Sequence, residues 1–475
     1  MKRRNNRKQD RLKASNRQAA AALTALVVAQ GAAAVGQTNT NTPPAPPSPS
    51  TNNPAAQLPE VVVQGQQDPG FNPETLSSPR FTEPLRNLPQ TITVVPQAVI
   101  ESRGASTLRD VLRNVPGISM QAGEGGGGLP GDNLSIRGFN ARSDIFIDGV
   151  RDTGAYSRDP FNIQQVEVFK GPTSATAGRG STGGSVNLVS KTPQLDRFYS
   201  GTLGFGTDDY TRLTADLNQP IDELPVKGAA LRLNGLWHDA GVPGRDIVEE
   251  SRWSVAPSFT VGLETPTRIS LSYLHMEQDN VPDYGIPWVP VGNTNAVLSR
   301  YINKAPPVDF DNFYGIKGYD FEDVISRLGT VIIDHDFSST FSLRNLSRYG
   351  QTDRSSAITA PRFADLNPDA PVESDQLINR QLQRRDMENR VLANLTDAKI
   401  EFPTGPVEHT TVGGFEVSRE DQDNRNSAQT FNQPQTDIFN PTPRDRPLGP
   451  MPPNIGAPNE VTAITLAPYV FDTIK

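Results

Sequence analysis

From residue 198 onward, polar and apolar side chains alternate along stretches of about 9 to 14 residues, a length typical of tilted membrane strands. Leu213, Ala215 and Leu217, for example, alternate with Arg212, Thr214, Asp216 and Asn218. Ten such stretches lie near 199–206, 210–218, 229–238, 252–262, 267–277, 323–334, 339–349, 388–402, 407–418 and 461–474. Alternating side chains lie on opposite faces of a β-strand, so each stretch has one apolar and one polar face.

The connections between these stretches alternate in length. Short ones lie at 263–266, 335–338 and 403–406, and long ones at 278–322, 350–387 and 419–460. A soluble β-sandwich also alternates its residues, but tight turns at one rim and long loops at the other are typical of outer-membrane barrels. We therefore predict antiparallel transmembrane β-barrel strands over 198–475.

Composition excludes a helical membrane protein. Only 35% of the residues are hydrophobic, mean hydropathy is −0.48, and past the N-terminal region no apolar run is long enough for a spanning helix. Barrel strands need only alternate, so this composition permits a β-barrel. Cysteine is absent, so order must come from hydrogen bonds and burial rather than disulfides.

The first 36 residues have the features of a secretory signal peptide. Eight Lys or Arg and one Asp lie between residues 2 and 17, followed by the apolar stretch 19–29 and the small residues 31–34. A transmembrane anchor would need a longer apolar core. Removal of residues 1–36 lowers the net charge from −8 to −15. This acidic balance argues against nucleic acid as a partner.

A flexible linker and a short β-prone segment follow. Residues 37–57 are rich in Pro, Asn and Ser and cannot bury a core. Residues 58–65, Leu-Pro-Glu-Val-Val-Val-Gln-Gly, are either an edge strand of the next domain or a peptide that adds a strand to a partner's sheet.

Residues 71–193 read as a small domain of short helices and strands. Thr107 and Asp110 have capping-box spacing before a helix, whose apolar face carries Leu108, Val111, Leu112 and Val115. Four short strands are expected at Ser135–Phe139, Ile145–Ile147, Val166–Phe169 and Ser185–Val189, and Asp148-Gly149 is a hairpin signal that joins two of them. The sequence thus predicts an α+β domain followed by the barrel strands.

Four ordered blocks in this domain resemble the plug of TonB-dependent outer-membrane receptors. They are Leu-Ser-Ile-Arg-Gly-Phe at 134–139, Asp-Ile-Phe-Ile-Asp-Gly-Val-Arg-Asp at 144–152, Gln-Val-Glu-Val-Phe-Lys-Gly-Pro at 165–172 and the Gly-rich run at 178–193. The variant at 151–162 is most similar to the catecholate siderophore branch.

The resemblance implies a bacterial outer-membrane receptor for iron(III)–siderophore complexes, set in outer-membrane lipid. It implies a TonB box at Pro59, Glu60, Val61, Val62, Val63 and Gln64, and as a partner TonB with its inner-membrane energising complex. Iron would be carried as a siderophore complex, with no cofactor bound by the protein. The segment before the plug is too short for the signalling domain of some relatives.

Ligand contacts are expected where cationic and aromatic side chains gather, because ferric catecholates are anionic and rimmed by rings. On the plug these are Arg142, Arg151, Tyr156 and Arg158; in the long loop 278–322 they include Tyr284, Trp288, Tyr301 and Tyr314. Surface salt bridges for the arginines and self-packing for the loop aromatics are the alternatives.

Contacts between plug and barrel are expected at Arg137, Glu167 and Arg179. A guanidinium buried between plug and wall must find carboxylates. In the resembled family the arginines of the Ile-Arg-Gly-Phe and Gly-Arg-Gly blocks contact barrel acids. We expect those acids in strands beyond the ten found here.

Other site classes have no support in the sequence. Neither Gly123–Gly128 nor Gly178–Gly184 carries the Gly-Lys-Ser/Thr ending of a phosphate loop. The four histidines lack metal-ligand spacing, and no nucleophile stands near a base, so we predict neither a metal site nor an enzyme.

The strand count is low for the resembled family, whose barrels close with about 22 strands. We therefore expect an open partial barrel from a C-terminally truncated chain. Two other functions stay open: a non-transporting surface β-protein such as an adhesin or binding module, and the same transporter type for a vitamin, a saccharide or haem.

Overall fold

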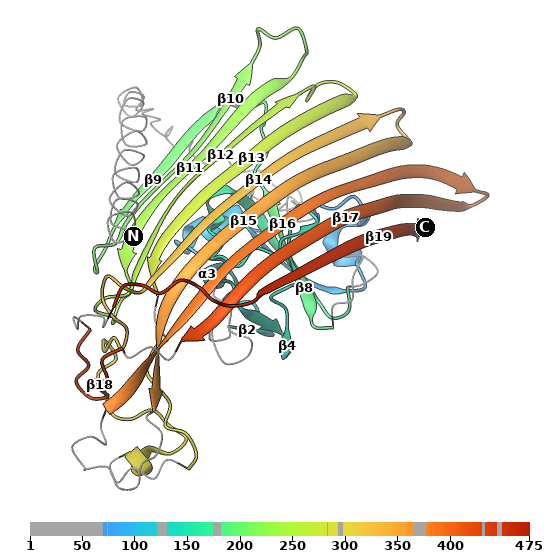
Figure 1. The fold of residues 1–475 in the computed structure, drawn as a ribbon. Coiled ribbons are helices and arrows are strands. Elements are labelled where there is room, and N and C mark those ends of the chain that lie inside the picture. The colour runs from blue at the N-terminus through green and yellow to red at the C-terminus, as the bar shows by residue number, and fades with distance from the viewer. Residues whose placement is uncertain are drawn as a thin grey trace, which may run out of the picture.

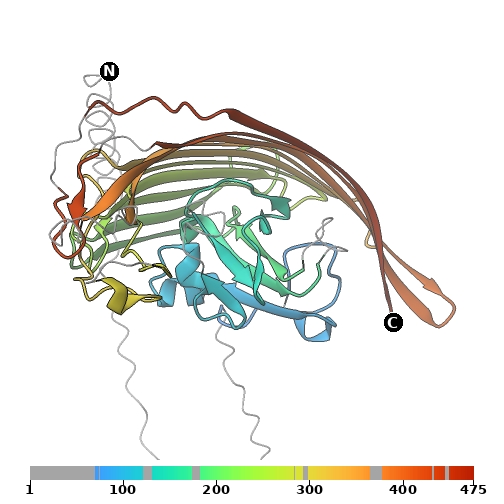
Figure 2. The ribbon, with the colours of Figure 1, turned by 60° about the horizontal axis from the view of Figure 1, so that its bottom comes forward.

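The computed structural model describes residues 70–73, 75–120, 131–173, 182–282, 284–292, 298–363, 377–429, 433–443 and 449–475. A long curved wall of antiparallel strands carries a smaller domain, the plug, on its concave side (Figures 1 and 2). The predicted signal peptide, linker and TonB box lie outside the described residues, as do Arg179 and residues 123–128.

The wall strands are neighbours in chain order from β9 to β19. Their bounds are β9 Phe198–Phe205, β10 Thr211–Ile221, β11 Ala229–Gly241, β12 Glu249–Val261, β13 Thr267–Val281, β14 Phe321–Asp336, β15 Phe341–Phe363, β16 Leu377–Thr404, β17 Val407–Gln429 and β19 Pro458–Ile474; the short β18 Thr436–Asp437 pairs with β16. In the part of the chain that the structure describes, β9 and β19 are the two edges, so the sheet is open.

All ten predicted strands are present, but β15, β16 and β17 are much longer than predicted. Pairing of β15 with β16 continues from Gly350↔Val391 to Phe363↔Ile378, through residues assigned to a long loop. Backbone pairing needs no apolar face, so these strands continue beyond the stretches in which apolar and polar residues alternate. The prediction of loops over all of 350–387 and 419–460 is therefore wrong.

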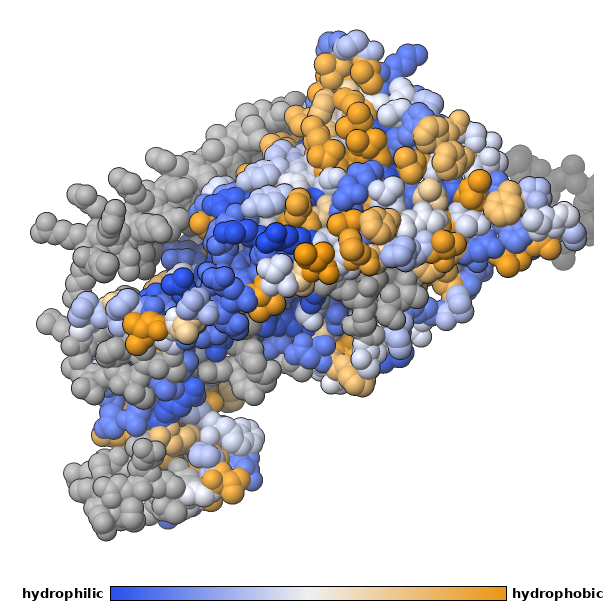
Figure 3. Space-filling view, turned by 45° about the vertical axis from the view of Figure 1, so that its right-hand side comes forward, coloured by the Kyte–Doolittle hydropathy of each residue, from blue (hydrophilic) through white to orange (hydrophobic). Residues whose placement is uncertain are grey.

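The two faces of the wall differ as the alternation predicts. Outward side chains such as Leu271, Tyr273 and Leu392 are exposed, whereas Leu328 and Leu346 point inward and are buried. Figure 3 shows hydrophobic and hydrophilic side chains gathered in separate regions of the surface. An exposed apolar face of this kind suits lipid rather than water. Among the described residues, no helix is both long and apolar enough to cross a membrane.

The plug is built on two small sheets. The larger has the order β1-β7-β8-β5-β6, and the smaller the order β2-β3-β4. The bounds are η2 Leu85–Asn87, β1 Thr91–Pro96, α2 Gln97–Ser102, α3 Leu108–Leu112, β2 Ile118–Met120, β3 Leu134–Ile136, β4 Phe139–Asn140, β5 Ile145–Ile147, β6 Val150–Arg151, η3 Pro160–Asn162, β7 Ile163–Lys170 and β8 Gly184–Ser190; the loop of the wall adds η4 Leu298–Tyr301.

Helix α3 forms as its sequence predicts. The Thr107 hydroxyl accepts from the Asp110 amide at 3.1 Å, and the Asp110 carboxylate accepts from the Thr107 amide at 3.2 Å, which completes a capping box. The predicted apolar face of the helix is buried in the plug core with the strands of the larger sheet.

Two turns differ in detail from the prediction. Asp148-Gly149 does form a hairpin with positive φ at both residues, but it joins β5 to the two-residue β6 rather than to another of the four predicted strands. The expected strand Ser135–Phe139 is split by Arg137 and Gly138, which also have positive φ, so β3 turns directly into β4.

Candidate functional site

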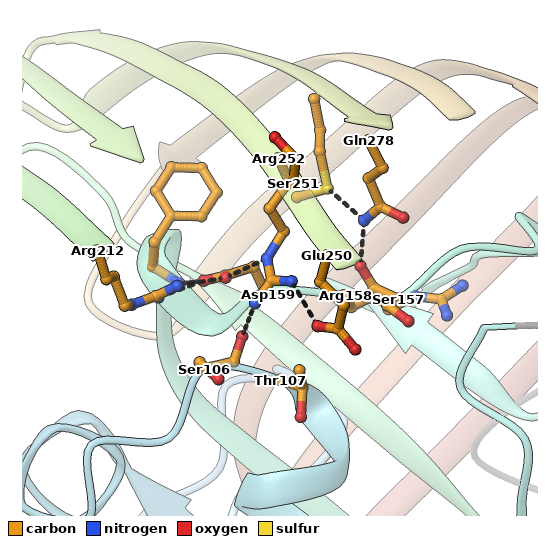
Figure 4. A network of polar contacts seen from close by, with 12 residues as sticks. Ser106, Thr107, Ser157, Arg158, Asp159, Arg212, Glu250, Ser251, Arg252 and Gln278 are labelled. Atoms are coloured by element: carbon orange, nitrogen blue, oxygen red, sulfur yellow. Dashed lines mark hydrogen bonds and ion pairs between the residues drawn. The ribbon is translucent and has the colours of Figure 1, made fainter. Parts of the chain in front are cut away.

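One buried carboxylate fastens the plug to the wall. Asp159 lies at the start of η3, and its carboxylate oxygens accept hydrogen bonds from two arginines of the wall. The guanidinium nitrogens of Arg212 of β10 lie at 2.7 and 2.8 Å, and that of Arg252 of β12 lies at 2.9 Å (Figure 4). Arg252 also donates to the backbone carbonyl of Ser106 at 3.0 Å. Two strands of the wall and two segments of the plug therefore meet at a single point.

The charges at this point are well matched. Burial opposes ionisation of the Asp159 carboxylate, but Arg212 and Arg252 lower its pKa to about 2. The acid is therefore fully charged at neutral pH. It lies between two guanidinium groups, whose planar arrangement of N–H donors matches the oxygens of a carboxylate. Removal of one member of such a buried group would leave uncompensated charge.

Further ion pairs repeat this pattern around the plug. Asp148 pairs with Arg348 of β15 at 2.7 Å, and Arg151 pairs with Glu420 of β17 at 3.1 Å. Asp216 of β10 pairs with Lys191 of the plug at 2.9 Å. The carboxylate comes from the plug in some pairs and from the wall in others, so together they fix the plug's position along the wall.

Tyr156 and Arg158, both expected as ligand contacts, are buried inside this interface. The Tyr156 hydroxyl donates to Asp152 at 2.8 Å, and its ring packs with Leu236 and Met276 of the wall. Arg158 pairs with Asp132 at 3.0 Å and with Asp152 at 2.8 Å. Burial opposes its charge, but the neighbouring acids raise the pKa of Arg158, so it remains a guanidinium cation that shapes the plug loop.

Arg142 has different surroundings. Burial and the positive charges of three other arginines lower the pKa of Arg142 to about 10. Those arginines are Arg158 of the plug, Arg354 of β15 and Arg385 of β16. Arg354 is held by Glu322 at 2.7 Å, yet its Nη1 is buried without a hydrogen-bond partner. We call Arg142, Arg354 and Arg385 the vestibule arginines; they lie farther toward the long loops than the Arg348 pair.

The aromatic residues of the long loop between β13 and β14 have several environments. Tyr314 is buried and donates to the carbonyl of Ile438 at 2.7 Å, and Tyr301 packs beside it and under Lys304. Tyr284 is half-buried, and Trp288 is 62% exposed. Of the four, only Trp288 presents most of its ring to a ligand from solution.

The two described residues that were expected to join the plug to the barrel have different surroundings. Glu167 is fully buried within the plug, where it accepts from the Ser77 amide at 2.7 Å and from Asn187 at 2.9 Å. Arg137 is exposed at the β3–β4 turn, beside Lys170 and Gly171. Within the described ranges, no group of three or more His, Cys, Asp or Glu side chains is arranged to hold a metal ion.

Comparisons with known proteins agree with this architecture. A family model described as "TonB-dependent Receptor Plug Domain" matches residues 84–185. The chain is 42% identical over 375 residues to the "Probable TonB-dependent receptor BfrD" of Bordetella pertussis, with 78% of this chain and 48% of the relative covered. It is 33% identical to the "Catecholate siderophore receptor Fiu" of Escherichia coli K12, covering 94% of this chain and 56% of that one.

Solved structures give the same result. The crystal structure of the ferric-catecholate import receptor Fiu from Escherichia coli, closed form, superposes with a TM-score of 0.77 at 34% identity, over 85% of this chain and 56% of the other. The siderophore receptor PiuA of Acinetobacter baumannii superposes with a TM-score of 0.73 at 28% identity, over 86% and 58%. The chain belongs to the TonB-dependent receptors.

This receptor chain spans about half the length of the curated relatives that it matches. The predicted α+β plug followed by antiparallel barrel strands is confirmed by the plug match and by the fold of these structures. The relatives are named as receptors, which agrees with the predicted outer-membrane location.

Sequence reasoning missed most of the charged residues that hold the receptor's plug. Arg212, Arg252 and Arg348 all lie at polar positions of alternating strands, which marks them as facing inward. That alternation could have placed them on the plug side. It could not have shown that Arg212 and Arg252 converge on Asp159, because their strands are separated by β11 and their partner lies elsewhere in the chain.

Proposed function

We propose that this chain is part of an outer-membrane receptor that takes up iron(III)–siderophore complexes with energy from TonB. The single observation that carries the cargo class is the setting of Arg142, a half-buried guanidinium whose pKa is lowered by burial and by three other arginines. The positive charges that gather around Arg142 favour an anionic ligand there, and low local polarity strengthens that preference.

A ferric tris-catecholate fits this setting better than a neutral complex. Its negative charge complements the vestibule arginines, and guanidinium planes can stack on catechol rings. The relative named as a catecholate siderophore receptor supports the same ligand class. Arg142 keeps its expected ligand role, with Arg354 and Arg385 as neighbouring positive charges. Arg151, Tyr156 and Arg158 are assigned to holding the plug, because their charges or hydroxyls already have partners.

Of the loop aromatics, Trp288 is the one that we retain as a ligand contact. Tyr284, Tyr301 and Tyr314 are assigned to the shape of the loop. Iron is cargo here, carried by the siderophore, and we propose neither a resident cofactor nor catalytic residues.

The domain boundaries belong to the proposal as well. We propose a signal peptide at 1–36, a linker at 37–57, a TonB box at 58–65, a plug at 71–193 and barrel strands at 198–475. The partners are TonB with its energising complex, the ferric siderophore and outer-membrane lipid.

Replacement of Val62 by Pro tests the transport function. Proline removes a backbone donor and should prevent strand pairing between the box and TonB. In iron-starved cells of the source bacterium, we expect ferric catecholate to bind the variant receptor normally and iron uptake to fall to background. Ala56→Pro in the linker is the matched control and should leave uptake unchanged. Normal uptake by the Val62→Pro variant would contradict the assignment.

A further inference from the structure

The plug begins with a segment that touches both the plug sheet and the wall. We call residues 77–83 the strap. On the plug side, the Ser77 amide and hydroxyl donate to Glu167 at 2.7 and 3.2 Å, and the Phe81 ring stacks on Phe169 with centroids 5.4 Å apart. The strap therefore lies along β7, a central strand of the plug.

On the wall side, Arg80 is held by a joint that spans three strands. Its guanidinium lies 4.1 Å from the centre of the Tyr469 ring of β19, donates to the Tyr469 hydroxyl at 3.0 Å and is 3.5 Å from the Asp397 carboxylate of β16. The Tyr469 hydroxyl donates in turn to Asp397. Both Arg80 and Asp397 are largely shielded from water, so the joint is an enclosed one.

A glycine of the intervening strand makes this joint possible. Gly414 of β17 pairs with Asp397 on one side and with Tyr469 on the other. A Cβ on Gly414 would lie 2.2 Å from the Tyr469 hydroxyl oxygen, so the tyrosine can reach across β17 only because no side chain stands there. Asp397, Gly414 and Tyr469, which lie on three strands, thus form one binding site for the Arg80 guanidinium.

The strap also forms one side of a cavity between plug and wall. The cavity is lined by Arg80 and Phe81 of the strap, by Phe169 of the plug and by Ser270, Ser272 and Arg344 of the wall. Ser270 is three residues from the start of β13 and Arg344 three residues from the start of β15. The cavity therefore lies at the short-turn end of the wall, opposite the long loops.

We propose that the strap closes this cavity and that Arg80 is the positioning residue that fastens it to the wall. The inference rests on the proposed function, because it needs a pull on the TonB box. Ser77 lies twelve positions after Gly65, the end of the box. At most about 40 Å of chain lies between them. A pull on the box therefore reaches the strap before any strand of the plug, and release of Arg80 opens the cavity while the Asp159 anchor still holds.

A reversible cross-link tests whether the strap must leave the wall. The hydroxyl oxygens of Thr82 and Thr473 are 2.6 Å apart, and this sequence has no cysteine that would compete within the chain for a Thr82→Cys/Thr473→Cys pair. In the source bacterium, we expect the oxidised pair to bind ferric catecholate within twofold of wild type and to lose at least tenfold of iron uptake. Reduction should restore uptake, and each single cysteine should behave as wild type.

Uptake by the fully oxidised pair at the wild-type rate would contradict the proposal that the strap must leave the wall. Absence of uptake in wild type and single variants alike would instead contradict the proposed function. In that case, hydrogen exchange of the purified receptor would test whether Arg80 fastens the strap to the wall. Arg80→Ala should speed exchange of amides 77–83 at least tenfold, and Arg86→Ala, which removes an exposed arginine just after the strap, should not. Equal exchange rates of amides 77–83 in the two variants would contradict the proposed role of Arg80.

Discussion

The arginines inside this receptor fall into two regions with different surroundings. Around the plug, Arg212, Arg252 and Arg348 each meet a plug carboxylate at 2.9 Å or less. Toward the long loops, Arg142 lies among other arginines, and Arg354 keeps an unpartnered Nη1 beside its one acid. Under the proposed function, arginines that meet a plug carboxylate fasten the plug, and Arg142 contacts the ligand.

The largest effect should follow when a fastener loses its acid. Asp159→Ala leaves Arg212 and Arg252 buried without their carboxylate, so we expect plug docking to weaken by about 3 to 5 kcal/mol. Chemical unfolding of the purified receptor, followed by protease cleavage of the plug, measures this loss. Asp196→Ala removes an exposed acid from the segment before β9 and should change stability by less than about 0.5 kcal/mol. Equal curves for the two variants would show that Asp159 is not an anchor.

The two plug arginines that the sequence grouped together should respond in opposite ways. Arg158→Ala strands the buried acids Asp132 and Asp152, and we expect a loss of about 3 kcal/mol. Arg142→Ala removes one positive charge from among others, so stability should stay level or rise slightly. Thermal unfolding of both variants in one buffer makes the comparison. A larger loss for Arg142→Ala than for Arg158→Ala would reverse the distinction between the two regions.

A smaller, pH-dependent effect is expected in the long loop. Burial raises the pKa of Asp320 to about 7, although its carboxylate accepts from the Thr359 hydroxyl at 2.6 Å. Because the folded pKa lies above the unfolded value, the stabilisation is complete below about pH 4 and is lost as pH rises to about 7. Protection of the backbone amides around Asp320 against hydrogen exchange, corrected for intrinsic rates, should fall as the pH rises over this range. Asp320→Asn should abolish the trend; an unchanged trend would show that another group causes it.

The sequence predicted what local patterns determine. Alternation placed all ten wall strands, and the capping box and apolar spacing placed α3 with its buried face. Patterns failed where partners come from distant parts of the chain. Nothing local to Arg158 separates it from Arg142, because the difference is whether Asp132 and Asp152 fold back onto it. The long extensions of β15 to β17 were missed for a related reason: cross-strand pairing, rather than side-chain alternation, maintains them.

Binding of two cargoes to the Arg142→Ala receptor tests the central claim most directly. Ligand titration followed by tryptophan fluorescence would compare a ferric tris-catecholate with a neutral ferric hydroxamate, at low and at physiological salt. A lost charge-assisted contact is worth about 1.4 kcal/mol or more, so catecholate affinity should fall about tenfold, and less at high salt. Affinity for the neutral complex should stay within twofold. Equal losses for both cargoes would contradict recognition of the cargo's charge by Arg142.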